Sequence, residues 1–200
     1  MVIVVFGLAG AGKSTLARGL GDRLGLRVIH SSGLLRDLME GRAADRQHSR
    51  CNDGYWETPE GFRRLEQRLH DPVPLDVLAN ELLLEEVEAG QVVIDSWALP
   101  WLSPKGYKLA LRASLAVRAG RAAVRAGLPL AEVEPRIAQK DEQTRALFRR
   151  LYGFDLIRDW QVFNRVIDCD HLTAAEVLER ALQDLGEGYQ GPSGTSLGTI

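Results

Sequence analysis

Apolar runs alternate along the chain with segments of helical periodicity. The runs 2–6 and 91–95 predict two buried parallel strands, and shorter runs at 27–30, 107–111 and 165–168 predict three more. Apolar positions at helical spacing predict helices over 13–24, 34–40, 75–89, 114–126, 130–151 and 173–185. This alternation predicts an α/β fold, in which about five parallel strands carry helices on both faces and ligands bind at the carboxyl ends of the strands.

Several residues mark where these helices begin and end. Gly25 and Gly90 follow apolar helical segments and are expected to end them. Ser31 and Ser32 are plausible N-caps for the helix that follows, and Pro59 is expected to begin another. Thr173, with Glu176 three residues on, predicts a capping box at the last helix.

Length and composition predict one globular domain. The chain has 200 residues and a formal net charge of −2, and we expect residues 1–185 to form the domain and the Gly- and Ser-rich tail 186–200 to be disordered. Residues 41–62 are rich in Gly, Asp, Asn and Arg, which predicts a mobile insert. No run of about 18 apolar residues exists, and Met1 passes directly into a predicted strand, so we expect a cytoplasmic protein that does not enter a membrane.

The cysteines predict neither a disulfide framework nor a redox pair. Cys51 and Cys169 lie far apart and form no CxxC motif. His48 and Cys51 have a spacing that metal ligands can use, but no second ligand pair stands nearby, so a polar loop is favoured there.

The most specific motif joins the first predicted strand to the first predicted helix. Gly7-x4-Gly12-Lys13-Ser14 is the full P-loop pattern, in the strand-to-helix context that this pattern requires. Its glycines allow backbone N–H groups to approach phosphate oxygens, and the helix start adds partial positive charge. Lys13 is expected to reach the β- and γ-phosphates of ATP, Ser14 to ligate Mg²⁺, and Thr15 to contact the α-phosphate. The predicted nucleotide-binding residues are Gly7, Ala9, Gly10, Ala11, Gly12, Lys13, Ser14 and Thr15.

Arginines are concentrated between residues 112 and 150. The net acidity of the chain and the lack of interleaved aromatic residues disfavour a nucleic-acid groove, so a phosphate clamp is the preferred interpretation. For any single arginine, a solvated helix face is a strong alternative.

Five segments follow one another in a recognisable order. They are the loop 7–15, Ser31-Ser32-Gly33-Leu34-Leu35-Arg36, the stretch 71–76, the strand 92–94 leading into Ala98-Leu99-Pro100-Trp101, and Tyr152-Gly153-Phe154-Asp155 with Asp159 and 165–168 downstream. In this order the chain resembles the nucleoside monophosphate kinases, in particular the short archaeal-type cytidylate kinase family. The resemblance covers about residues 1–185 and implies a P-loop kinase fold with an acceptor-binding insert at about 41–89 and a lid at about 128–151.

The resemblance also implies roles for individual residues. ATP with Mg²⁺ would be the donor, and CMP or dCMP is the preferred acceptor, a small-molecule nucleotide held by a monomer or homodimer. Arg36 is assigned to the acceptor phosphate, while Arg136, Lys140, Arg145 and Arg149 are assigned to the reacting phosphoryl group; these four cannot all converge. Asp95 is a candidate for the metal side, with capping of the next turn an equal alternative. Asp76 could accept a hydrogen bond from an exocyclic amine or stabilise a helix start.

Two departures from the family pattern concern the acceptor. Asp95-Ser96-Trp97 stands where the family has Glu-Gly-Arg, and Lys140-Asp141 replaces an Arg-Glu pair. Neither Trp nor Lys reproduces the bidentate fork of a guanidinium. Trp97 could stack on a substrate, whereas core packing is favoured for Trp101. Asp155 and Asp159 could order the lid arginines or be solvated. A P-loop kinase of another small metabolite and an ATP-binding regulatory module without transfer activity therefore remain alternatives.

Overall fold

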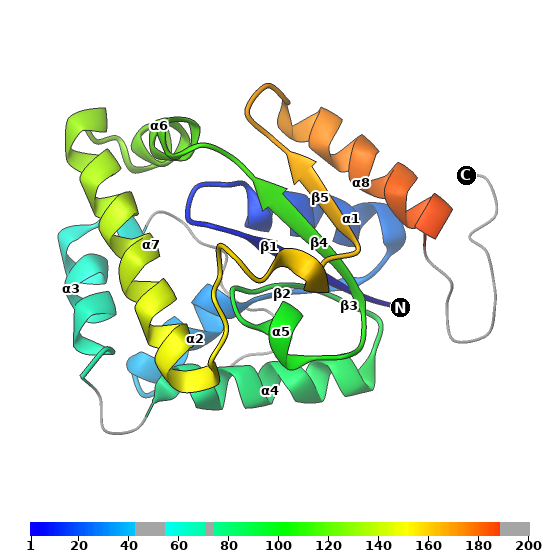
Figure 1. Ribbon diagram of the computed structural model, residues 1–200, viewed down its shortest axis with the longest axis horizontal. Helices are drawn as coiled ribbons and strands as arrows, with labels where there is room; N and C mark the ends of the chain where they lie inside the picture. The colour runs from blue at the N-terminus through cyan, green and yellow to red at the C-terminus, as the bar shows by residue number, and fades with distance from the viewer. Residues whose placement is uncertain (43–54, 71–73, 189–200) are drawn as a thin grey trace.

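Five parallel strands form a single sheet in the order β2-β3-β1-β4-β5 (Figure 1). The computed structural model describes residues 1–42, 55–70 and 74–188. The strands are β1 (Val2–Gly7), β2 (Arg27–His30), β3 (Val92–Asp95), β4 (Tyr107–Arg112) and β5 (Arg165–Asp168). The sheet confirms the α/β prediction. Because β1 lies between β3 and β4, its carboxyl end is at the place where the strand order changes direction, and ligands bind there in folds of this kind.

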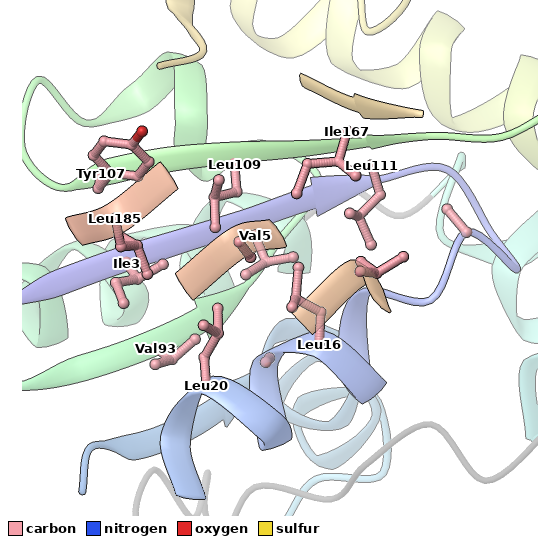
Figure 2. Close-up of a cluster of buried hydrophobic side chains, with 14 of the residues drawn as sticks. Ile3, Val5, Leu16, Leu20, Val93, Tyr107, Leu109, Leu111, Ile167 and Leu185 are labelled. Carbon is pink, nitrogen blue, oxygen red and sulfur yellow. The ribbon is translucent and has the colours of Figure 1, made fainter. Parts of the chain in front are cut away.

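Both faces of β1 are buried, which explains its continuous apolar run. Ile3 and Val5 point into one core cluster, whereas Val4 and Phe6 point to the opposite face. Figure 2 shows the first cluster, with side chains from β1, β3, β4 and β5 meeting those of the helices that cover this face of the sheet. A strand buried on both sides cannot alternate apolar with polar residues.

Helices cover both faces of the sheet. They are α1 (Lys13–Leu24), α2 (Ser31–Met39), α3 (Pro59–Gln67), α4 (Leu75–Ala89), α5 (Leu99–Leu102), α6 (Leu115–Ala126), α7 (Leu130–Tyr152) and α8 (Ala174–Gly188), with short 3₁₀ turns at Tyr55–Glu57 and Trp160–Val162. Helices α1 and α8 pack on the face drawn in Figure 2, and α2, α4 and α5 pack on the other. Helices α6 and α7 form a hairpin whose second arm runs beside α3 (Figure 1).

Several of the predicted helix ends are confirmed, and the predicted start of α2 is wrong. Gly25 ends α1 in the left-handed conformation, and the Thr173 hydroxyl and Glu176 carboxylate cap each other's backbone N–H groups. Helix α2, however, begins at Ser31 directly after β2, three residues before the predicted Leu34. His30 is the N-cap and provides no side-chain cap, so Ser31 and Ser32 lie within the first turn.

Some sequence-based predictions fall outside the described residues. They concern the possible metal pair at His48 and Cys51, the larger part of the mobile insert, residues 71–73 of the acceptor segment, and residues 189–200 of the tail. The last helix extends to Gly188, three residues past its predicted end. Among the described residues, no helix combines the length and the apolar character needed to cross a membrane.

Trp101 belongs to an aromatic cluster above the sheet, as predicted. Its ring stacks on Phe154 with centroids 4.7 Å apart and meets the edge of Phe6 at 5.1 Å. The indole N–H donates to the carbonyl oxygen of Asp159 at 2.7 Å, so the partly buried polar group of Trp101 has a partner. This cluster fixes the segment after β3 against the segment after α7.

Candidate active site

The loop between β1 and α1 has the backbone conformation that close phosphate approach requires. Gly10 and Gly12 have φ angles of +81° and +105°, which side-chain-bearing residues rarely adopt. A Cβ atom on Gly10 would lie 2.4 Å from the carbonyl oxygen of Arg118 on α6. The loop can therefore pack this closely against α6 only because Gly10 has no side chain.

Two arginines of α6 hold the loop through its carbonyl oxygens. Arg118 Nη1 donates to the oxygen of Ala9 at 3.0 Å, and Arg121 Nη1 donates to the oxygen of Ala11 at 3.4 Å. Arg118 also forms a buried ion pair with Asp141 of α7 at 2.7 Å. These contacts fix the orientation of two loop peptides and join them to α6 and α7. Sequence analysis placed both arginines in a cationic segment without assigning them this role.

A cavity of about 170 Å³ opens beside the loop. It extends from the start of α1, past the carboxyl end of β3, to the inner faces of α4 and α7. The predicted site residues that line it are Ala9, Gly10, Gly12, Lys13, Ser14, Thr15, Asp76, Asp95, Trp97 and Lys140. Gly7 and Ala11 support the loop from outside the cavity wall. Residues separated widely in the sequence therefore meet in one cavity.

Lys13 lines the part of this cavity formed by the loop and the start of α1. Its ammonium group donates to the carbonyl oxygen of Leu8 at 3.4 Å and lies 5.3 Å from the centre of the Trp97 ring. Shielding from water lowers the pKa of Lys13 to about 8, and the negative charge of Asp95 opposes this shift. Trp97 thus contacts the lysine that the P-loop pattern assigns to the phosphates.

Asp95 is buried at the end of β3, where His30 ends the neighbouring strand β2. The His30 Nδ1 and Asp95 Oδ2 atoms are 2.6 Å apart, and the two residues are register partners in the sheet. Burial opposes ionisation of Asp95, but the hydrogen bond to His30, the charge of Lys13 and a hydrogen bond from Ser14 outweigh it and hold its pKa below the usual value. Asp95 is therefore a carboxylate in contact with the Ser14 hydroxyl.

The far end of the cavity contains a buried polar group that sequence analysis identified only in part. Arg68 Nη1 donates to Asp76 Oδ1 at 3.1 Å, and Arg68 Nη2 donates to the hydroxyl of Thr144 at 2.8 Å. Asn80 lines the same end and donates to the hydroxyl of Tyr152 at 2.9 Å. Asp76 was predicted as a substrate-binding residue, whereas Arg68, Asn80 and Thr144 were not. Their sequence positions carry no motif that marks them.

Four predicted arginines do not line the cavity in this structure. Arg36 stacks on the ring of Tyr55 at 3.6 Å and donates to Glu40 at 3.0 Å. Arg136 pairs with Glu132 one turn earlier on α7. Arg145 and Arg149 both pair with Asp155. Of the four cationic residues predicted for the reacting phosphoryl group, only Lys140 reaches the cavity wall.

The parallel sheet, the glycine loop at its switch point and the cavity beside Lys13 define a P-loop kinase fold. The cytidylate kinase-like family matches residues 2–171, which is most of the chain. The chain therefore belongs to this family, and the resemblance drawn from the sequence is confirmed.

Two curated relatives agree with this assignment. The cytidylate kinase of Pyrobaculum aerophilum is 28% identical over 185 residues, which cover 91% of this chain and 91% of the relative. The cytidylate kinase of Ignicoccus hospitalis is 30% identical over 181 residues, which cover 89% of this chain and 95% of the relative. The similarity thus extends over nearly the whole length of both relatives.

A solved structure supports the fold independently. The shikimate kinase from Bacteroides thetaiotaomicron superposes with a TM-score of 0.57 at 19% identity, covering 94% of this chain and 96% of that one. At this level of identity the likeness concerns the fold alone.

Proposed function

We propose that this chain is an ATP-dependent nucleoside monophosphate kinase that transfers the γ-phosphoryl group of ATP to CMP or dCMP. The observation that carries the proposal is one continuous cavity, which has the P-loop lysine at one end and the Arg68–Asp76 pair at the other. Membership of the cytidylate kinase-like family supports the same activity. In the reaction, a phosphate oxygen of the acceptor bonds to the γ-phosphorus, the bond from that phosphorus to the β–γ bridging oxygen breaks, and ADP leaves with the electron pair.

The donor half of the site uses the loop and the start of α1. Backbone N–H groups of the loop and the ammonium of Lys13 would hold the phosphates of ATP, and Thr15 lies at the same helix start. Arg125 of α6 and Lys140 of α7 line the cavity wall as well. Phosphoryl transfer needs positioning and charge neutralisation more than covalent chemistry, and these cations supply both.

The residues present fit Mg²⁺ bound in company with phosphates. The Ser14 hydroxyl and the Asp95 carboxylate lie together at the cavity wall and are hard oxygen donors, the ligand type that Mg²⁺ prefers. Among the described residues, no group of three or more His, Cys, Asp or Glu side chains could form a metal cage, which suits an ion that keeps waters and phosphates as ligands. When bound, the ion would neutralise phosphate charge.

The acceptor half is proposed to hold the base at Asp76 and Arg68. Cytosine presents an amine donor beside a ring-nitrogen acceptor, so a carboxylate next to a guanidinium complements it. Uracil presents a carbonyl where cytosine has the amine, and that oxygen would face the carboxylate of Asp76. Arg36, Arg136, Arg145 and Arg149 stay predictions for phosphate contacts, because each is bound elsewhere in this structure.

ADP production, measured against a panel of ribo- and deoxynucleoside monophosphates, tests the proposal. We expect the highest kcat/KM with CMP or dCMP, and the Lys13→Ala variant should lose about 10²–10³-fold in kcat. Rates at background across the panel would reject it.

Other acceptors belong in the same assay, because Trp97 leaves this wall of the cavity without the guanidinium of the family pattern. Turnover of a different small hydroxyl or phosphate compound would identify a P-loop kinase of another metabolite. ATP binding without turnover of any acceptor would instead favour a regulatory module.

A further inference from the structure

Arg68 lies where three separate elements meet. It follows directly on α3 and is 8% exposed. One Nη atom donates to Asp76 of α4, and the other donates to Thr144 of α7. Its Nε atom is buried and has no hydrogen-bond partner within the described part of the chain. Because a guanidinium has five N–H donors, Arg68 retains capacity to bind a further group in the cavity.

The groups around Arg68 form a hydrogen-bonded polar cluster in the cavity wall. Four polar residues line this part of the cavity: Arg68, Asp76, Asn80 and Thr144. Tyr152, near the end of α7, accepts from Asn80 and donates to the carbonyl oxygen of Asp76 at 3.4 Å. Helices α4 and α7 are therefore linked directly through Tyr152 and indirectly through Arg68. Figure 1 shows α7 crossing from α6 toward the first turns of α4.

This arrangement makes the position of α7 sensitive to what binds at Asp76. Thr144 is 1% exposed, and its hydroxyl receives a hydrogen bond from a charged, buried donor. Such bonds are stronger than neutral ones and are lost at high cost when the donor turns away. A base that matches Asp76 leaves Arg68 in place to hold Thr144. A base that repels the carboxylate displaces Asp76 and Arg68 together.

We propose that Arg68 is a specificity-determining residue that couples recognition of the acceptor base to the position of α7, through its hydrogen bond to Thr144. This inference rests on the proposed function. Lys140 lies one helical turn before Thr144 on the same face of α7 and reaches the phosphate end of the cavity. A correct base at one end of the cavity would thus help to keep a cationic side chain in place at the other. The choice between bases would then appear in kcat as well as in KM.

The test compares CMP with UMP in three enzymes. Thr144→Val keeps the shape of the side chain and removes the hydroxyl, whereas Thr144→Ser retains the hydroxyl. For the wild type we expect a CMP preference in both kcat and KM. In Thr144→Val the kcat ratio between CMP and UMP should fall about tenfold, the size expected for one hydrogen bond to a charged group. Thr144→Ser should restore most of that ratio.

A matched control lies on the same interface outside the cavity. Gln139 of α7 donates to Glu66 of α3 at 3.1 Å and is exposed. Gln139→Ala removes a bond between α7 and α3 without touching the base end, so it should change CMP and UMP turnover equally. A purely structural role for Thr144 would likewise change both substrates alike.

The same assays distinguish failure of this inference from failure of the proposed function. If the wild type phosphorylates no pyrimidine nucleoside monophosphate, the proposed function fails. If it phosphorylates CMP with a base preference that is the same in wild type and Thr144→Val, Arg68 does not transmit base identity to α7. Equal kcat for CMP and UMP in the wild type would overturn the inference as well. If Thr144→Val does not fold, Thr144→Ala compared with Thr144→Ser provides the same contrast.

Discussion

Gly10 shows how a single residue fixes the distance between the phosphate loop and α6. Its φ is +81°, and the space where a Cβ would stand is occupied by backbone atoms of Arg118. Backbone cannot move aside as the end of a flexible side chain can. The loop therefore depends at this position on both the conformation and the size of glycine.

Replacing Gly10 by alanine tests this dependence. We expect Gly10→Ala to weaken ATP binding by at least about tenfold and to lower the free energy of unfolding by about 1–3 kcal/mol, because strain of this kind costs that much. Gly120→Ala is the control: Gly120 lies within α6 with nothing near the added Cβ, so alanine should stabilise the helix by up to about 1 kcal/mol. Titration calorimetry and urea unfolding measure the two effects. Unchanged ATP affinity in Gly10→Ala would contradict the interpretation.

Some residues of the candidate site could be picked out from the sequence and others could not. Lys13, Ser14 and Asp95 belong to local patterns, a P-loop and a strand end, whose geometry follows from neighbouring residues. Arg118 donates a hydrogen bond to Ala9, which is 109 positions away in the sequence, and Arg68 donates one to Thr144, which is 76 positions away. No local pattern encodes such pairs, because only the packing of α6 and α7 onto the sheet brings them together.

At the scale of elements, apolar periodicity predicted the strands and the long helices, since burial decides both. Apolar periodicity failed where short-range backbone geometry determines where a helix begins or whether a short helix forms. Helix α2 begins directly at Ser31, and the four-residue helix α5 (Leu99–Leu102) is too short to have a period. Periodicity alone also does not show which of the predicted cations on α7 face the cavity. Lys140, Thr144 and Phe148 share the face that lines the cavity, whereas Arg145 and Arg149 lie on another face and pair with Asp155.

Asp155 anchors the second half of α7 to the segment that follows it. Arg145 donates to both carboxylate oxygens, Arg149 donates to one, and the backbone N–H of Ile157 donates at 2.9 Å. The Arg145 guanidinium is the main cause that holds the pKa of Asp155 far below its usual value, although partial desolvation opposes this. Asp155 is 6% exposed and the side chain of Arg145 is 17% exposed, so their hydrogen bonds are better protected from water than the bond from Arg149, whose side chain is 44% exposed.

The low pKa predicts a dependence of stability on pH. In acid, the unfolded carboxyl binds a proton below about pH 4 while the folded one does not, so this part of the stability is present above pH 4 and is lost as the pH falls. Asp155→Asn should lower the free energy of unfolding by about 2 kcal/mol at pH 7. The difference from wild type should shrink between about pH 4 and pH 2. Glu142→Gln, an exposed partner of Arg145, is the control and should have little effect. A difference that stays constant in urea unfolding at acidic pH would contradict this role.

Across the whole molecule, the carboxyl edge of the sheet is enclosed by elements that come from distant parts of the chain. The loop after β1 forms its floor, α6 supports that loop from outside, and α7 returns over the cavity toward α3 and α4 (Figure 1). Arg118 connects the first three of these elements, because it bonds to Ala9 in the loop and to Asp141 on α7. Both side chains of the ion pair are at most 10% exposed.

Variants of Arg118 and Asp141 can separate the effect of this connection on stability from its effect on the geometry of the loop. Removing one member of a buried ion pair leaves the other charge unmatched, so Arg118→Met and Asp141→Leu should each cost about 3–5 kcal/mol, whereas the double variant should recover much of that loss. ATP affinity should behave differently. The carbonyl of Ala9 loses its donor in both variants that lack Arg118, so the double variant should bind ATP about tenfold more weakly than wild type despite its regained stability. Urea unfolding of the wild type, the two single variants and the double variant gives a double-mutant cycle for stability. Titration calorimetry on the same four proteins gives the cycle for ATP affinity. If the double variant recovered affinity together with stability, Arg118 would act on the loop only by keeping the molecule folded.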